Sequence, residues 1–188
     1  MSASLPPWRP LLRGARQREG RAPQARWLQL ASLGLDGAPR VRTLVFRGWG
    51  GPSQLDLLTD GRSVKAAELQ LEPRVELCWL LPRARSQFRL RGRRLELNHE
   101  ADAVAREQHW QQLNPGARAP WGWPEPGAPL QADAGFPSEL ADGAPMPACF
   151  ALIRIEIEQV ELLELGAHPH QRCRWRVDQG WAQERLNP

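Results

Sequence analysis

The sequence predicts a mainly β protein with peripheral helices (α+β), built as an antiparallel barrel, and two observations support this. Short runs in which apolar and polar residues alternate are separated by Gly, Pro, Asn and Asp turn signals. Only a few stretches with helical periodicity interrupt these runs. Of the 188 residues, 41% are hydrophobic and 24% charged, which is typical of one globular domain. We place that domain at residues 26–188, after a Pro- and Arg-rich segment at residues 1–25.

The expected strands follow one another from residue 27 onward. Residues 74–81 show the clearest alternation, because every second residue from Val75 to Leu81 is apolar. Residues 41–46 are β-branched and aromatic, and Asp36-Gly37 before them is a hairpin signal. The other strands are expected at residues 27–33, 54–58, 86–97, 149–157, 160–165 (after a bend), 172–177 and 181–185.

Three helices are expected beside the barrel, at residues 10–18, 62–71 and 101–113. Ser63 can cap the second of them. Residues 114–147 contain eight prolines, which predicts irregular structure. Trp121 and Trp123 in this stretch indicate that it docks on the rest of the protein.

Several classes of protein are excluded. No apolar run is long enough for a transmembrane helix, and arginines interrupt the apolar part of the first twenty residues, unlike a signal peptide. Three distant cysteines and four histidines without ligand spacing predict no disulfide framework and no metal site. The sequence lacks a G-x-S-x-G elbow, a P-loop and a G-x-G-x-x-G. We expect a cytoplasmic protein that binds no membrane.

One lysine stands among the 25 basic residues, and it points to a binding site. Lys65 lies with Thr59, Arg62 and Ser63 around the start of the expected second helix. Free backbone N–H groups, the helix dipole and cationic side chains together suit a phosphate group. The residues alone leave a second interpretation open, in which Lys65 pairs with an acidic residue further along the helix and Ser63 only caps it.

Four segments in order resemble the pyridoxamine 5'-phosphate oxidase family of FMN-binding split barrels. They are Arg42-Thr-Leu-Val-Phe-Arg47, Leu58-Thr-Asp-Gly-Arg-Ser-Val-Lys65, Ser86-Gln-Phe-Arg-Leu-Arg-Gly92, and His170-Gln-Arg172 with the terminal Trp181 to Pro188. The similarity runs from about Trp27 to Pro188. Its pattern resembles a divergent branch of the family more than the vitamin B6 enzyme itself.

The resemblance implies a homodimeric, FMN-dependent oxidoreductase with FMN at the subunit interface, transferring a hydride between a small-molecule substrate and the flavin. In this assignment Arg42 and Lys65 hold the cofactor phosphate, and Gln87 meets the polar edge of the flavin. The implied cofactor-binding residues are Arg42, Thr43, Leu44, Val45, Arg47, Thr59, Arg62, Ser63, Lys65, Gln87 and Arg172. The implied substrate-binding residues are Arg47, Arg118, His168 and His170.

The chain departs from the family pattern mainly on the substrate side. Val64 and His168 stand where the family has arginines, and the helix that contacts the substrate phosphate in the family reads Trp110, Asn114 and Arg118 here. We therefore expect a retained FMN pocket and a rebuilt substrate pocket.

Two alternatives remain at this point. The first is a protein that binds FMN or a B6 phosphate without turnover. The second is a nucleic-acid binder that uses the arginines of residues 89–94. We rank it low, because no exposed aromatic residues are interleaved with those arginines.

Overall fold

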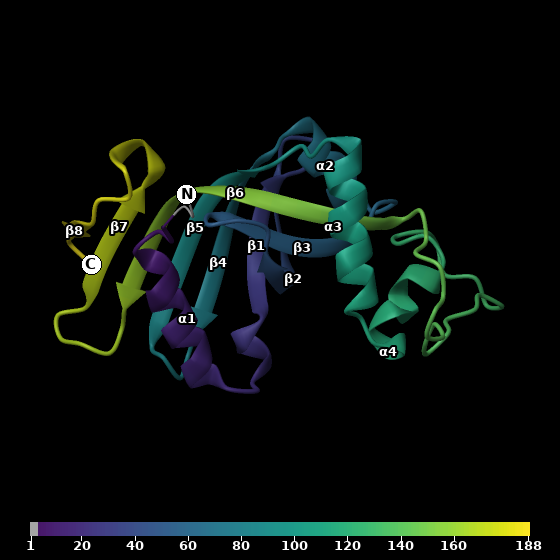
Figure 1. The fold of residues 1–188 in the computed structure, drawn as a ribbon, viewed down its shortest axis with the longest axis horizontal. Coiled ribbons are helices and arrows are strands. Elements are labelled where there is room, and N and C mark those ends of the chain that lie inside the picture. The colour runs from purple at the N-terminus through teal and green to yellow at the C-terminus, as the bar shows by residue number, and fades with distance from the viewer. Residues whose placement is uncertain (1–3) are drawn as a thin grey trace.

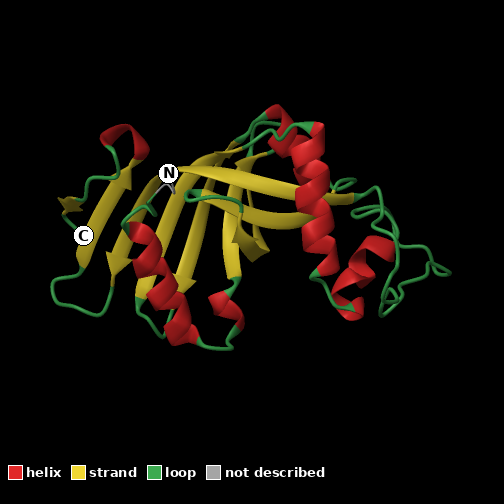
Figure 2. Cartoon of the chain, viewed as in Figure 1, coloured by secondary structure: helices red, strands yellow, loops and turns green. Residues whose placement is uncertain are grey.

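A closed antiparallel barrel flanked by helices forms the centre of the computed structural model, which describes residues 4–188 (Figures 1 and 2). The strand order is β3-β2-β1-β4-β5-β6-β7-β8, and pairing of β3 with β6 closes the first six strands into the barrel. The barrel strands are β1 (Trp27–Leu33), β2 (Pro39–Trp49), β3 (Gln54–Asp60), β4 (Arg74–Leu81), β5 (Ser86–Arg94) and β6 (Phe150–Glu164). Strands β7 (Gln171–Arg176) and β8 (Glu184–Leu186) extend the sheet beyond β6. This architecture confirms the predicted fold class.

Alternation of apolar and polar residues builds the barrel core. In β4, Val75, Leu77, Trp79 and Leu81 are all buried, as the period of two predicts. In β5, Phe88 and Leu90 face the core while Arg91 and Arg93 are exposed. The outward residues of β5 therefore share one face with the outward residues of the paired strands.

Strand β6 is one element of 15 residues, where the sequence suggested two strands and a bend. The bend is a β-bulge. Arg91 pairs with Gln159, but the next residue of β5, Gly92, pairs with Ile157, so β6 carries one extra residue. Gly92 is required there, since a Cβ atom would lie 2.0 Å from the carbonyl oxygen of Glu156.

The last expected strand differs from the structure. It runs over Glu184–Leu186 rather than residues 181–185. Trp181 has a φ of 63°, in the left-handed region, and its backbone N–H donates to the carbonyl oxygen of Arg176 at 2.9 Å. This closed turn keeps Trp181 out of the strand and places its ring beside Trp8.

Helix α1 (Trp8–Glu19) packs on the barrel through Trp8, Leu12 and Ala15, all buried. A single 3₁₀ turn, η1 (Pro23–Ala25), links it to β1. Helix α2 (Val64–Leu71) begins directly after Ser63, which occupies the expected cap position although its side chain makes no capping hydrogen bond to the helix. No helix within residues 4–188 is long and apolar enough to cross a membrane.

Helix α3 (His99–Gln111) begins after Asn98, whose side chain accepts a hydrogen bond from the backbone N–H of Ala101 at 2.8 Å. It packs beside β6 over a second apolar cluster that includes Trp110 and Phe150. Residues 114–147 are mostly irregular, as predicted, apart from α4 (Pro115–Arg118) and the 3₁₀ turn η2 (Ala119–Gly122). A third 3₁₀ turn, η3 (Val177–Gln179), follows β7.

Candidate functional site

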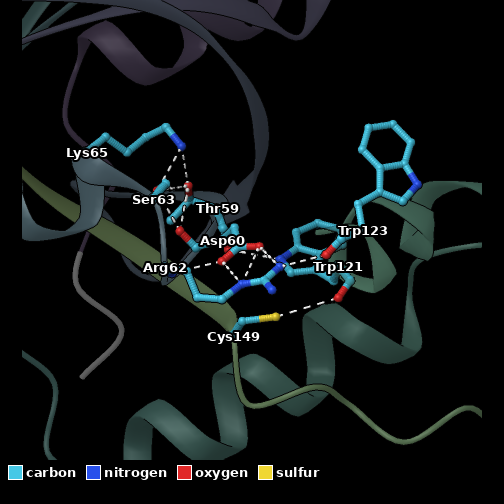
Figure 3. A network of polar contacts seen from close by, with 8 residues as sticks. All are labelled: Thr59, Asp60, Arg62, Ser63, Lys65, Trp121, Trp123 and Cys149. Carbon is cyan, nitrogen blue, oxygen red and sulfur yellow. Dashed lines mark hydrogen bonds and ion pairs between the residues drawn. The ribbon is translucent and has the colours of Figure 1, made fainter. Parts of the chain in front are cut away.

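The end of β3 and the start of α2 hold a half-buried cation, Lys65, on neutral partners (Figure 3). The Lys65 ammonium donates to the hydroxyl oxygen of Thr59 at 2.6 Å and to that of Ser63 at 3.1 Å. Both hydroxyls are buried. Burial and then the charge of Arg42 lower the pKa of Lys65. Within residues 4–188 Lys65 has no ion pair, so the pairing with an acidic helix residue does not form.

Arg42 lies near Lys65, and it comes from β2, where its side chain faces the barrel interior opposite Leu30 of β1. Its guanidinium forms an ion pair of 2.6 Å with Glu68 of α2 and donates to the hydroxyl oxygen of Ser32. Glu68 is buried. Glu68 compensates the charge of Arg42, whereas Lys65 contacts only hydroxyls, which leaves an excess positive charge at this position.

Arg62 lies on the opposite side of Ser63 from Lys65, as Figure 3 shows. It pairs with the carboxylate of Asp60 at 2.6 Å and donates to the carbonyl oxygen of Trp123 at 3.1 Å. The Trp121 indole donates to the carbonyl oxygen of Thr59 at 3.0 Å. Arg62 and Trp121 thus anchor the proline-rich segment to the end of β3, so the docking expected from Trp121 and Trp123 is confirmed, at a position that the sequence did not indicate.

The other cofactor-binding candidates lie on the outer face of the barrel or at its rim. Thr43 and Val45 of β2 face outward opposite Gln29 and Trp27, whereas Leu44 faces inward and packs against the core. Gln87 of β5 lies opposite Leu163 of β6, which in turn lies opposite Arg172 of β7. Arg172 forms an ion pair of 2.6 Å with Glu161.

These outward residues are far from the Lys65 cluster within one chain. Thr59 of that cluster pairs with Ala151 of β6, whereas Gln87 pairs with Leu163, twelve residues further along the same strand, or about 40 Å of extended strand. Arg172 of β7 lies opposite the same Leu163, so it is equally far along β6 from Thr59. The candidates therefore fall into two groups, one around Arg42 and Lys65 and one around Gln87 and Arg172.

Arg47 lies at the other end of β2, beside a cavity of about 600 Å³ between β2 and α3. Its Nε atom is buried and has no hydrogen-bond partner within residues 4–188. Burial and then the charge of Arg26 lower the pKa of the Arg47 guanidinium.

The same cavity is lined by a network around the buried Asp56 carboxylate, which the sequence did not predict. The Asp56 carboxylate binds Arg154 at 2.7 and 2.8 Å and contacts the Nε2 atom of His109 at 2.9 Å. Burial opposes ionisation of Asp56, but the hydrogen bonds from Arg154 and His109 outweigh it and lower its pKa. The sequence did contain one sign of this network. Asp56 lies inside the apolar run of residues 55–58, and a carboxylate that is buried in such a run needs polar partners.

The remaining substrate-side candidates lie elsewhere. Arg118 is 6% exposed and donates to the carbonyl oxygens of Trp110 and Ala141, so it ties α3 to the segment that follows. His168 and His170 are exposed in the turn between β6 and β7. Figure 1 places that turn at the opposite end of the molecule from α3. A single chain therefore does not bring these histidines to Arg47.

Comparison with known proteins identifies the family. Residues 5–97 match the model of the pyridoxamine 5'-phosphate oxidase FMN-binding domain. A solved FMN-binding protein from Nostoc punctiforme, described as pyridoxamine 5'-phosphate oxidase-related, is 38% identical, with a TM-score of 0.88 over 99% of this chain and 100% of that one. This chain belongs to that family. The resemblance seen in the sequence motifs is confirmed.

Two further relatives extend the comparison of this oxidase-related chain. Pyridoxine/pyridoxamine 5'-phosphate oxidase 2 of Arabidopsis thaliana is 29% identical over the whole of both chains. PhzG from Burkholderia lata, solved in complex with tetrahydrophenazine-1-carboxylic acid, is 18% identical and shares the fold with a TM-score of 0.76, covering 97% of this chain and 94% of that one.

The matched domain is an FMN-binding one, so FMN is the cofactor of this oxidase-related protein, as predicted. The residues present fit such a group. Lys65 is a desolvated ammonium that only hydroxyls contact, next to the free backbone N–H groups of a helix start. An unpaired cation of this kind suits a phosphate dianion.

Proposed function

We propose that this protein is an FMN-dependent oxidoreductase that acts on a small-molecule substrate as a homodimer, with FMN in the interface between two chains. Bound FMN would accept or deliver the hydride, while the protein supplies position and electrostatics. The observation that carries the proposal is the positive excess at Lys65 and Arg42, in a chain of an FMN-binding family. Membrane or nucleic-acid binding has no part in it.

The phosphate of FMN is proposed to lie against Lys65 and Arg42. The hydroxyl oxygens of Thr59 and Ser63 accept two of the three hydrogen bonds that the Lys65 ammonium can donate. Its third N–H is therefore free to bind the FMN phosphate. Arg42 is held by Glu68 and Ser32, which fixes the guanidinium in place before the cofactor arrives. Arg62 would act indirectly, because its side chain is used to anchor Trp123.

The homodimer follows from the separation of the two groups of candidates. Gln87 and Arg172 lie beside Leu163 of β6, twelve residues along that strand from the pairing partner of Thr59, too far to reach a flavin whose phosphate lies at Lys65 of the same chain. A second copy packed on the outer face would bring its own Gln87 and Arg172 to that flavin. The outer face also carries large exposed apolar side chains, among them Trp27 at 49% and Val41 at 71% exposure, which favours burial by a partner.

Spectroscopy and sedimentation on the purified protein test this proposal together. We expect flavin absorption bands, one FMN for each chain and the mass of a dimer. Anaerobic addition of pyridoxamine 5'-phosphate or a reduced nicotinamide, each as a probe donor, should bleach the flavin bands if the donor reaches the flavin. Bands that no donor bleaches would favour the binding protein without turnover. A colourless protein that takes up no FMN would refute the proposal.

A further inference from the structure

A carboxylate on the outer face of the barrel holds Arg172, the arginine that the proposed dimer brings to the flavin of the second chain. One carboxylate oxygen of Glu161 in β6 accepts hydrogen bonds from the Nε and Nη2 atoms of Arg172, at 3.2 and 2.6 Å. Its other oxygen accepts a hydrogen bond from the amide of Gln159 at 3.2 Å. Glu161 is only 7% exposed, although it lies on the outer face. A buried carboxylate therefore fixes the direction of the Arg172 guanidinium.

The strand register shows how Glu161 comes to bind Arg172. Arg174 of β7 stands directly opposite Glu161, whereas Arg172 lies diagonally from it, opposite Leu163. Glu184 of β8 binds the Arg174 guanidinium at 2.9 Å. Because β8 supplies this separate partner for Arg174, Glu161 is left to Arg172.

A second arginine shares the carboxylate oxygen that binds Arg172. Arg89 of β5 lies opposite Glu161, and its Nη1 atom is 3.5 Å from that oxygen. Glu76 of β4 binds Arg89 at 2.6 Å and lies 3.3 Å from Arg91. Opposite charges thus alternate across β4, β5, β6 and β7, which are neighbours in the sheet (Figure 1). Three arginines on two glutamates leave one positive charge in excess.

The Arg172 guanidinium keeps donors that a ligand can use. Its Nη1 atom makes no hydrogen bond within the described residues 4–188, and 32% of the side chain is exposed. Gln87, Leu163 and Arg172 form one row across three strands. Arg172 can therefore stay on Glu161 and bind a second group beside Gln87 at the same time.

We propose that Glu161 is a positioning residue for FMN, which holds Arg172 in place for the flavin of the second chain and sets how much of the arginine's charge acts on that flavin. The inference rests on the proposed function. It adds a residue that lies outside every segment that carries the family resemblance. Reduction adds negative charge to a flavin, so a cation beside it favours reduction, and a carboxylate that compensates the cation opposes it. Glu161 thus tunes the reduction potential of bound FMN through Arg172.

The midpoint potential of bound FMN tests the inference, because it responds to charge near the flavin and needs no substrate. Glu161→Gln keeps a hydrogen-bond acceptor for Arg172 but removes the negative charge, so the potential should rise. Arg89→Gln removes the second cation on Glu161, so the carboxylate compensates Arg172 more fully and the potential should fall. A merely structural role would shift the potential of both variants in the same direction.

A double-mutant cycle shows whether Glu161 acts through Arg172. When Arg172→Gln is already present, Glu161→Gln should change the potential by less than half as much as it does alone, because the charge that it compensates is gone. Glu161→Ala also removes the hydrogen-bond acceptor. It should weaken FMN binding about tenfold, since Arg172 is no longer held for its charge-assisted bond.

Glu158→Gln is the matched control. Glu158 lies on the same strand, three residues before Glu161, and forms a 2.6 Å ion pair with Arg93 of β5. Its removal should leave the potential and the FMN affinity unchanged, because this exposed pair is screened by solvent. Arg89 is itself 38% exposed, so its variant tests the inference even if a change at the buried Glu161 prevents folding.

The two proposals fail in different ways. A protein that holds FMN overturns this inference if Glu161→Gln and Arg89→Gln leave the potential unchanged or shift it in the same direction, and the proposed function then still stands. A protein that takes up no FMN overturns the proposed function, and with it the role of Glu161.

Discussion

The guanidinium of Arg42 forms a 2.6 Å ion pair with the carboxylate of Glu68, which lies on α2 three residues after Lys65. The carboxylate is buried, and Ser32 accepts a second hydrogen bond from the same guanidinium. Glu68 thus orients Arg42 and cancels one of the two positive charges at the barrel end. A phosphate dianion would bind against the remaining charge and against donors already held in place.

Replacing Glu68 tests this balance. Glu68→Gln leaves Arg42 without its counter-charge, and we expect it to destabilise the FMN-free protein by about 3 kcal/mol. FMN then meets one more uncompensated cation, so it should stabilise the variant more than it stabilises the wild type. Urea unfolding with and without FMN measures both effects. If FMN stabilised the wild type and Glu68→Gln equally, the FMN phosphate would not bind at Arg42.

Lys65 should contribute directly to FMN affinity. Its charge-assisted bond to the phosphate is worth on the order of 1.5–3 kcal/mol, so Lys65→Ala should weaken FMN about tenfold or more. Quenching of FMN fluorescence on binding gives the dissociation constant. Gln70→Ala, an exposed change on the same helix, is the matched control and should leave it unchanged. Unaltered FMN affinity in the Lys65 variant would refute the assignment.

The pKa of Lys65 gives FMN binding a pH dependence. Burial and the charge of Arg42 hold it below 10.5 in the free protein, and a phosphate dianion beside the ammonium raises it again. Binding therefore takes up a proton at alkaline pH, and FMN affinity should fall as the pH rises through the lowered pKa of Lys65 towards 10.5. Over the same window the free protein should gain stability, because the unfolded lysine keeps its proton longer.

Two sets of FMN titrations across that pH range check the effect. The wild type should show the decline, and Lys65→Arg should not, since an arginine stays charged throughout. A parallel decline in both proteins would assign the titration to another group.

Asp56 should matter more for stability than for FMN binding. Asp56→Asn leaves the partly buried Arg154 without its carboxylate, which should cost about 3 kcal/mol of unfolding free energy. Thermal or urea unfolding measures the loss. The paired change Asp56→Leu with Arg154→Met should recover most of it, because an apolar pair leaves no buried charge unpaired. No recovery would mean that His109 or another partner carries the effect.

Local patterns predicted the parts of this fold that depend on neighbours in sequence. The alternation in residues 74–81 fixes the faces of β4, and the Thr59 to Lys65 segment folds on itself, so its polar cluster was visible in the sequence. The break in alternation near Glu158 likewise indicated the bend in β6.

Contacts between distant segments were not predictable in this way. Asp56 meets partners that are 53 and 98 residues away, and nothing near Asp56 in the sequence identifies them. Arg16 and Arg47 converge only because α1 packs across the end of the barrel. Arg118 matched the expected position of a substrate ligand, yet its exposure and its carbonyl partners depend on how residues 114–147 fold back.

Disrupting the homodimer should release FMN. A variant that cannot dimerise therefore tests whether FMN binds in the interface between the two chains. Trp27 lies on the outer face of β1, next to Val45 of β2, and Trp27→Glu would place a charge in the proposed interface. We expect this variant to sediment as a monomer and to lose most of its FMN, because the second chain no longer supplies Gln87 and Arg172. Leu130→Glu, in the exposed proline-rich segment, is the control and should remain a dimer with FMN bound. A wild-type monomer that holds FMN tightly would show that one chain suffices, and the separation of Gln87 from Lys65 would then need another explanation.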